Sequence, residues 1–271
     1  MHPLIVSAPF GNYHKFLGRV IGTDFTPTLG TFTWERRGFW TKPYGGPLTR
    51  LLLTLRYSPT FKSWKNRIGL KNPGIRSLVA LPSFSYTPNI KVSDKIISIY
   101  GWDMGEWVNL LQVCRDFKPL AVEINASCPN VHKPPFSGEL FRLGVQYGLN
   151  LIVKLPPVGF QKIAAMAWAE GVRTFHATNT LPTPKGGLSG KALLPVALEA
   201  VRQLREAYPE AKIIGGGGIT TLEDAQEFRA RGANHVAVGS VLFSPWRWRE
   251  VRKIAGAMTQ ATTLEDALGG R

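Results

Sequence analysis

Cysteine is scarce in this sequence, which contains only Cys114 and Cys128 among its 271 residues. Two cysteines without a paired spacing exclude a disulfide-stapled fold and suit the reducing cytoplasm, where we expect the protein to be located. Long apolar runs are also missing, since none approaches the roughly 20 residues that a membrane-spanning helix requires. The stretch MHPLIVSAPF (1–10) carries no positively charged leader, so we expect a strand there rather than a signal peptide.

Acidic residues are in short supply as well. The chain has 18 Asp and Glu against 33 Lys and Arg, which gives a formal net charge of +15. A surface of this charge attracts phosphates, nucleic acids and anionic lipids without discriminating among them. A basic protein without a nucleic-acid partner is the simpler interpretation, and the 44% of hydrophobic residues allow a substantial core.

Short β-branched runs alternate with helical patterns along the chain, as expected for a parallel sheet built from βα units. Helical spacing is clearest in 105–117, 193–208 and 221–232, where apolar residues recur every three or four positions. Eight strands with crossover helices at this length predict an α/β fold of the (β/α)8 TIM-barrel type, which we expect to form a single domain over 1–271. The predicted strands are LIVSA (4–8), TLGTFT (28–33), IISIYG (96–101), AVEIN (121–125), LIVKL (151–155), TFHAT (174–178), KIIGGG (212–217) and HVAVGS (235–240).

The segment 34–76 breaks this alternation. It is rich in Arg, Lys, Trp, Gly and Pro, too long for an ordinary βα loop and too irregular for a helix. We therefore predict an irregular insertion after the second strand that covers the top of the barrel, where substrates bind.

Polar and glycine-rich groups follow the predicted strands, at the barrel face where functional groups normally sit. Cys128 follows the fourth strand in VEINASCPN (122–130), and Lys154 lies within the apolar fifth strand. A buried lysine needs a partner, so Lys154 is difficult to explain as a purely structural residue. Glycine groups at 186–190, 215–218 and 239–240 leave backbone N–H groups uncovered, and together they predict a phosphate-binding site.

The succession EINASCPN, VKLPP, TNT, GGLSGKALLP, IIGGGGI and GSVLF resembles the dihydroorotate dehydrogenase family of FMN-dependent barrels. The resemblance extends upstream to NRIGLKNPG (66–74) and downstream to LEDALG (264–269), so it covers nearly the whole chain. Members of this family oxidise dihydroorotate to orotate in pyrimidine biosynthesis and pass a hydride to FMN. The resemblance therefore implies an FMN oxidoreductase acting on a CH–CH group, with a cysteine base like that of the soluble class.

The same resemblance implies roles for individual residues. Cys128 matches the base that removes one hydrogen as a proton, and Lys154 matches a lysine that contacts the flavin and stabilises its reduced form. Amide side chains suit a pyrimidine ring because they both donate and accept hydrogen bonds. The implied substrate-binding residues are Asn72, Asn125, Asn130, Asn179 and Thr180. The implied FMN-binding residues are Ala8, Gly11, Thr31, Asn125, Lys154, Thr178, Ser189, Gly190, Gly217, Gly218, Gly239 and Ser240, and no metal site is expected.

Structural interpretations compete with several of these roles. Asn72 precedes a Pro-Gly pair and could serve its turn, and Asn125 and Asn179 could cap turns at strand ends. Cys114 lies at an apolar helix position, where a buried structural cysteine is expected. His176 lies in the middle of a strand, and we predict a packed core histidine there rather than a catalyst.

The pattern departs from the family in one respect that concerns the substrate. Family members carry a second active-site lysine early in the barrel, where this chain has Asn12 or Gly30, with Lys15 a few residues away. The motif NRIGLKNPG resembles the quinone-using class, whereas the cysteine resembles the soluble class. The sequence leaves open the electron acceptor (fumarate, NAD through a partner subunit, or a quinone) and whether the protein forms a homodimer.

Two other functions remain as alternatives. An FMN enzyme of the tRNA-dihydrouridine synthase type, acting on RNA, would suit the positive charge and the basic, aromatic insertion. Those enzymes have a glycine directly before the cysteine, where this chain has Ser127. The other alternative is a flavin-binding relative that lost its turnover together with the early lysine.

Overall fold

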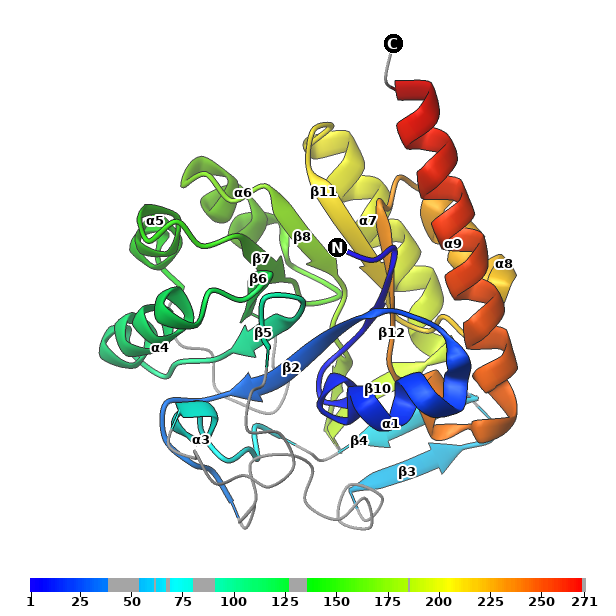
Figure 1. Cartoon of the computed structure of the whole chain (residues 1–271), viewed down its shortest axis with the longest axis horizontal. Coiled ribbons are helices and arrows are strands. Elements are labelled where there is room, and N and C mark those ends of the chain that lie inside the picture. Colours follow the sequence, from blue (N-terminus) through cyan, green and yellow to red (C-terminus); the bar gives the residue numbers. More distant parts are fainter. Residues whose placement is uncertain are drawn as a thin grey trace.

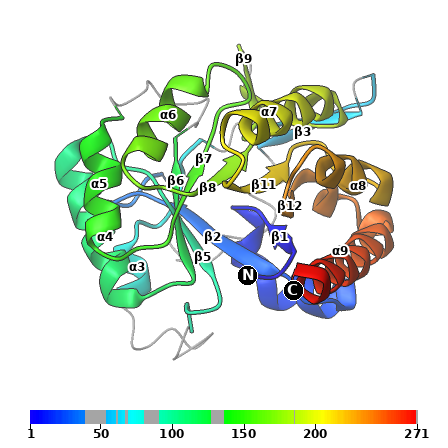
Figure 2. The same cartoon turned by 90° about the horizontal axis from the view of Figure 1, so that it is seen from above.

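The computed structural model describes residues 1–38, 54–60, 62–66, 69–79, 91–126, 136–184 and 186–269. Eight parallel strands close into a barrel, which confirms the predicted (β/α)8 architecture and each of its eight predicted strands. In Figure 2 the helices surround these strands, with α4, α5 and α6 on one side and α7, α8 and α9 on the other. The strands follow one another around the barrel in the order β1 (Leu4–Val6), β12 (His235–Val238), β11 (Lys212–Gly216), β8 (Thr174–Ala177), β7 (Leu151–Lys154), β6 (Ala121–Asn125), β5 (Ile96–Ile99) and β2 (Thr26–Phe32).

The outer helices begin and end close to where the apolar periodicity places them. The principal ones are α4 (Met104–Phe117), α5 (Gly138–Gln146), α6 (Gln161–Ala169), α7 (Leu194–Ala207), α8 (Leu222–Ala230) and α9 (Trp248–Gly269). Shorter helical segments are η1 (Phe10–Tyr13), α1 (His14–Leu17), η2 (Gly18–Gly22), α3 (Arg76–Val79), η3 (Lys191–Leu193), η4 (Ser240–Phe243) and η5 (Pro245–Arg247). Within the described residues, no helix has the length and apolarity needed to cross a bilayer.

Local side-chain chemistry sets where two of the outer helices start. The side chain of Asp103 accepts a hydrogen bond from the backbone N–H of Glu106 at 2.8 Å and caps α4. Thr221 and Asp224 form a reciprocal capping box at the start of α8. Buried Trp107, Leu110, Leu111 and Cys114 then form the inner face of α4, so Cys114 is a core residue as predicted.

A second, four-stranded sheet lies at one end of the barrel and corrects two predictions (Figure 1). It contains β3 (Leu55–Ser58), β4 (Ser63–Asn66), β10 (Gly186–Gly190) and β9 (Leu181–Thr183). The insertion is therefore not irregular throughout, and the glycine group 186–190 is a strand rather than a helix-opening turn. Antiparallel pairing of β10 with β4 explains both differences, since two segments far apart in sequence satisfy each other's backbone groups.

The barrel interior is built in layers. Six side chains form an apolar cluster of their own, separate from the core between strands and helices: Ile5, Ile96, Ala121, Ile152, Ile214 and Ala237. Because side chains alternate along a strand, residues two positions further on point into the barrel as well. On β6, β7 and β8 this next inward layer contains Glu123, Lys154 and His176, all of them buried. An apolar plug thus supports a buried layer of ionisable groups.

The packing of α4 gives a stability prediction. Trp107 is fully buried and contacts Gly101, where an added Cβ would lie 2.8 Å from the indole ring. Replacing Trp107 by Ala should lower the free energy of unfolding by about 3–5 kcal/mol, because it removes a large buried side chain and leaves a cavity. The measurement is urea denaturation followed by circular dichroism.

Trp246→Ala is the matched control, since Trp246 is 77% exposed. Its unfolding free energy should change by less than about 0.5 kcal/mol. Equal losses in the two variants would contradict this description of the α4 interface.

Candidate active site

A cavity lies at the carboxyl ends of the barrel strands, with the second sheet along its border. Most of the predicted site residues that the structure describes line it. These are Ala8, Thr31, Asn72, Asn125, Lys154, Thr178, Asn179, Thr180, Ser189, Gly190, Gly217, Gly218, Gly239 and Ser240.

Of the predicted site residues that the structure describes, Gly11 does not line the cavity. Cys128 and Asn130 lie outside the described residues. Gly11 is buried against the backbone of β2, where a Cβ would lie 2.1 Å from the carbonyl oxygen of Thr28. Close packing of η1 on β2 therefore accounts for this glycine, and Gly11 is absent from the cavity lining.

Lys154 has the buried partner that the sequence analysis required. Its Nζ lies 3.8 Å from Oε1 of Glu123, and the other carboxylate oxygen, Oε2, lies 2.7 Å from Nδ1 of His176. Burial would raise the pKa of the Glu123 carboxyl, but the charge of Lys154 and the hydrogen bond with His176 outweigh burial and lower this pKa to about 2. Glu123 is therefore a carboxylate that compensates the positive charge of Lys154 at the floor of the cavity.

His176 is buried as predicted, but it does more than fill the core. Its imidazole lines the cavity and forms the hydrogen bond with Glu123. Burial and the nearby charge of Lys154 lower the pKa of His176, so the neutral imidazole is favoured. Neither Glu123 nor the cavity-facing role of His176 was predicted. Their positions on the inward face of AVEIN and TFHAT were the signal that could have revealed them.

The predicted asparagines Asn125 and Asn179 are connected in a polar chain across the barrel mouth. Nδ2 of Asn179 donates to Oδ1 of Asn125 at 3.1 Å, and Nδ2 of Asn125 donates to Oγ1 of Thr31 at 3.0 Å. The Thr31 hydroxyl in turn lies 3.0 Å from Oγ of Ser98. These bonds hold the two amides in fixed orientations on different strands, as the recognition of a planar polar ring requires.

Asn72 has a structural role that its predicted substrate contact did not anticipate. Its Nδ2 donates to the carbonyl oxygen of Leu70 at 2.7 Å and to Oγ1 of Thr33 at 3.0 Å. Its Oδ1 accepts from the backbone N–H groups of Gly74 and Thr33, at 2.8 and 3.1 Å. Protein groups thus use both donor hydrogens of the amide, as the turn-forming interpretation expected.

Asn66 was not among the predicted site residues although it begins the quoted motif NRIGLKNPG. It lies at the end of β4, lines the cavity and donates from Nδ2 to the carbonyl oxygen of Gly187 at 3.3 Å. The signal that could have identified it was the amide at the first position of that motif. Pairing of β4 with β10 brings it to the cavity.

Glycine is required where two turns meet at the cavity edge. Gly190, Gly217 and Gly218 have φ values of 105°, 126° and 90°, which side chains other than glycine rarely adopt. A Cβ on Gly218 would lie 2.7 Å from the carbonyl oxygen of Gly190 and 2.9 Å from the backbone nitrogen of Leu194. The two turns therefore pack backbone against backbone, which leaves a concave surface without side chains.

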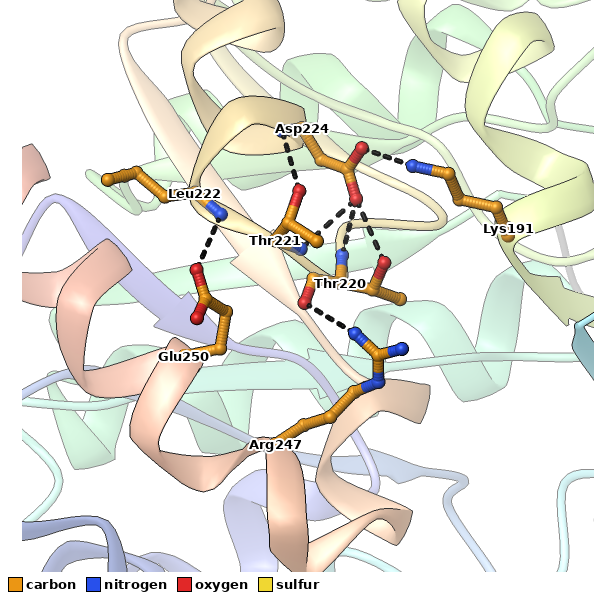
Figure 3. Close-up of polar contacts among 7 residues, drawn as sticks. All are labelled: Lys191, Thr220, Thr221, Leu222, Asp224, Arg247 and Glu250. Carbon is orange, nitrogen blue, oxygen red and sulfur yellow. Dashed lines mark hydrogen bonds and ion pairs between the residues drawn. The ribbon is translucent and has the colours of Figure 1, made fainter.

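An ion pair outside the cavity fastens these turns together (Figure 3). Nζ of Lys191, directly after Gly190, contacts Oδ1 of Asp224. Oδ2 of Asp224 accepts hydrogen bonds from N and Oγ1 of Thr220 at 2.8 and 3.0 Å, and from N of Thr221 at 3.1 Å. The single carboxylate of Asp224 thereby joins the start of η3 to the segment that follows Gly218.

Asn12 and Gly30, the two candidates for the position of the family's early lysine, are hydrogen-bonded to each other. Asn12 donates from Nδ2 to the carbonyl oxygen of Gly30 at 3.2 Å and accepts from its N–H at 2.9 Å. Lys15 is exposed on α1 and is absent from the cavity lining, so it does not replace the lysine. Among the described residues, the cations that line the cavity are Lys71 and Lys154.

The buried carboxylate predicts a specific dependence of stability on pH. Folding lowers the pKa of Glu123 from its ordinary value of 4.5 to about 2. The unfolded chain therefore binds more protons than the folded chain in this range, so the contribution of Glu123 is complete above about pH 5 and is lost as pH falls towards about 2. In Glu123→Gln this contribution of about 3 kcal/mol should be missing, and the free energy of unfolding should fall less steeply with acid.

At neutral pH the same variant should be less stable than the wild type, because Lys154 and His176 lose their anionic partner. Glu210→Gln, at an exposed position, is the control and should follow the wild-type curve. Urea titrations between about pH 5 and about pH 2.5 measure the effect. A Glu123→Gln curve parallel to that of the wild type would contradict the assignment.

Known proteins similar to this chain share one family name. The model of the family described as dihydroorotate dehydrogenase matches residues 55–255. A relative from Aquifex aeolicus, with the provisional name dihydroorotate dehydrogenase A (fumarate), is 34% identical over 207 residues, which make up 66% of this chain and 66% of the relative. The catalytic subunit of dihydroorotate dehydrogenase B (NAD(+)) from Thermotoga maritima is 34% identical over 203 residues, 66% of this chain and 72% of the relative.

The fold has a counterpart among solved structures. The ligand-free dihydroorotate dehydrogenase of Eimeria tenella superposes with a TM-score of 0.69 at 20% identity, covering 96% of this chain and 85% of that one. At this identity the likeness supports the fold alone. Because the family model spans most of the chain, the chain belongs to the dihydroorotate dehydrogenase family.

Proposed function

We propose that this protein oxidises dihydroorotate to orotate, with FMN as the hydride acceptor and Cys128 as the general base. One observation carries the proposal: in a chain of this family, a charge-compensated lysine, two linked asparagines and a glycine cradle converge on a single cavity. Cys128 is two residues beyond Ala126, which is the last described residue at the carboxyl end of β6. The base would therefore belong to the segment that continues directly from the strand bearing Asn125.

The residues present suit FMN. The concave backbone surface at Gly190, Gly217 and Gly218 would accept a phosphate group, since uncovered N–H groups at such turns bind anions. Thr178 lines the cavity, and its buried hydroxyl has no hydrogen-bond partner among the described residues. Lys154 supplies a positive charge, which favours a cofactor that becomes anionic on reduction. When bound, FMN supplies the electron sink that takes up a hydride.

The chain itself provides the proton chemistry and the orientation. Removing two hydrogens from adjacent carbons requires one to leave as a hydride and the other as a proton, and the Cys128 thiolate would accept the proton. An unperturbed thiol has a pKa of about 8.5, within reach of a base near neutrality. Asn125 and Asn179 are already held by each other and by Thr31, so they would orient the ring without a large ordering cost.

The relatives differ in the electron acceptor that their names specify. The Aquifex relative carries fumarate in its name, and the Thermotoga relative carries NAD(+) and is a catalytic subunit. We therefore propose that the reduced protein passes its electrons to a separate acceptor. Fumarate, and NAD(+) with a partner subunit, are the first two to test.

The direct test of the base is Cys128→Ala under anaerobic stopped flow. The purified wild type should be yellow and should bleach on mixing with dihydroorotate. The variant should retain the colour but bleach about 10²–10⁴ times more slowly, the usual contribution of a positioned acid or base. Cys114→Ala is the control, because this second cysteine is buried in α4 and should not affect the rate. A colourless wild type, or a Cys128→Ala protein that bleaches at the wild-type rate, would refute the proposal.

The phosphate cradle can be tested with Gly218→Ala. A Cβ there must displace the backbone of Gly190 or Leu194, so the affinity for FMN should fall at least about tenfold. Gly148→Ala is the matched control, since Gly148 also has a positive φ, of 70°, but a Cβ would meet nothing within 4 Å. Fluorescence quenching of FMN added to the cofactor-free protein measures both dissociation constants. Equal affinities in the two variants would place the phosphate elsewhere.

A further inference from the structure

His176 occupies a position in the cavity that the proposed function does not use. It lies on β8, paired in register with Lys154 on β7, and its side chain is 2% exposed. Lys154 is in turn paired in register with Asn125 on β6, so the three side chains lie on one row across β6, β7 and β8. The His176 side chain nevertheless reaches the cavity surface, because the neighbouring inward position on β11 is Gly216.

The hydrogen bond at Nδ1 determines where the imidazole carries its proton. Oε2 of Glu123 lies 2.7 Å from Nδ1, and an ionised carboxylate can only accept. The shared hydrogen must therefore reside on Nδ1. A neutral imidazole has one N–H, so Nε2 carries a bare lone pair and is an acceptor.

The accepting atom Nε2 lies beside Gly216, and both residues line the cavity. It lies 3.3 Å from the point where a Cβ on Gly216 would be, so any side chain larger than glycine at that position would crowd it. None of the described residues donates a hydrogen bond to Nε2. A buried acceptor at a cavity wall, without a partner from the protein, is suited to a donor on the ligand.

Glu123 brings this acceptor and a donor together. Its two oxygens hold Nζ of Lys154 on one side and Nδ1 of His176 on the other. Neighbouring strands are about 4.8 Å apart, so the cavity floor presents an ammonium donor beside an imidazole acceptor. A carbonyl next to an N–H, as along the edge of a cyclic imide, complements that pair.

We propose that Lys154 and His176 together recognise a cyclic imide edge, with Nζ donating to the carbonyl and Nε2 accepting from the adjacent N–H. Glu123 is the positioning residue that fixes both. The inference rests on the proposed function, because the flavin ring and the dihydropyrimidine both carry such an edge. Of the two, the flavin is favoured because His176 is paired in register with Lys154, the residue that the proposed function places beside the flavin.

Two substitutions of His176 separate its two nitrogens. In His176→Asn the amide N–H replaces Nδ1 and can still donate to Glu123, but the Nε2 acceptor is lost. In His176→Gln a polar group remains near the Nε2 position, but the donor to Glu123 is displaced. We expect His176→Asn to keep near-wild-type stability and to bind FMN about three- to tenfold more weakly, the effect of one hydrogen bond. We expect His176→Gln to lose stability and to retain more of the affinity.

His235→Asn is the matched control. His235 begins β12, at the opposite end of the barrel strands, and is absent from the cavity lining. Its affinity for FMN should equal that of the wild type. Wild-type affinity in His176→Asn would overturn the inference, even if the protein is yellow and is bleached by dihydroorotate.

Nitrogen NMR of the cofactor-free protein provides a readout independent of turnover. Before any addition, Nε2 of His176 should have the shift of an unprotonated nitrogen. FMN should then move this signal in the direction of an accepted hydrogen bond, and orotate added alone should not. A shift with orotate alone would assign the imide to the substrate and overturn the choice of flavin, and no shift with either compound would overturn the inference itself. A protein that binds neither compound would contradict the proposed function as well, so the two failures are distinguishable.

Discussion

The carboxylate of Glu123 is the constraint on which the site depends. Lys154 is 6% exposed, and an ammonium group buried to that degree is stable only beside an anion. Glu123 provides that anion from the adjacent strand and also fixes the tautomer of His176. The apolar cluster beneath, which includes Ile5 and Ala237, keeps water away from Glu123, Lys154 and His176. The low polarity there strengthens the attraction between the Glu123 carboxylate and the Lys154 ammonium. One acidic side chain thus makes a positive charge sustainable at the floor of a cavity in an otherwise hydrophobic barrel.

The arrangement around the glycine turns follows a different physical rule. There the surface offered to a ligand is backbone rather than charged side chains. Gly190 and Gly218 allow the two turns to approach more closely than a side chain at either position would permit. The ion pair between Lys191 and Asp224 lies outside the cavity and joins the elements that carry these turns. The charged floor and the uncharged cradle therefore form separate parts of the site. A ligand that combines a polar ring with a phosphate group would engage both.

The barrel was predictable from sequence because its strands are short runs rich in β-branched residues that alternate with helical patterns. Such runs are typical of parallel strands that are buried on both faces. The second sheet was not predictable, because Gly186–Gly190 has no strand propensity of its own and is held by pairing with a segment more than a hundred residues earlier. Lys154 could be identified as unusual from its apolar surroundings. The alternation in AVEIN could have indicated an inward Glu123, but its pairing with Lys154 follows only from the way β6 and β7 pair in the barrel. Asn72 shows the reverse case, where a motif position expected to contact substrate proves to organise its own turn.

The uncharged amide of Asn12 lines the cavity near the start of the barrel. It binds Gly30 through both of its polar atoms, so this wall is neutral and rigid, and Lys154 provides the deep positive charge. A crystal structure of the protein with FMN and orotate tests the whole account most directly. The account predicts the phosphate against Gly190 and Gly218, with the flavin ring beside Lys154 and His176. A flavin bound outside this cavity, or an Nζ of Lys154 that points away from the ring, would contradict it.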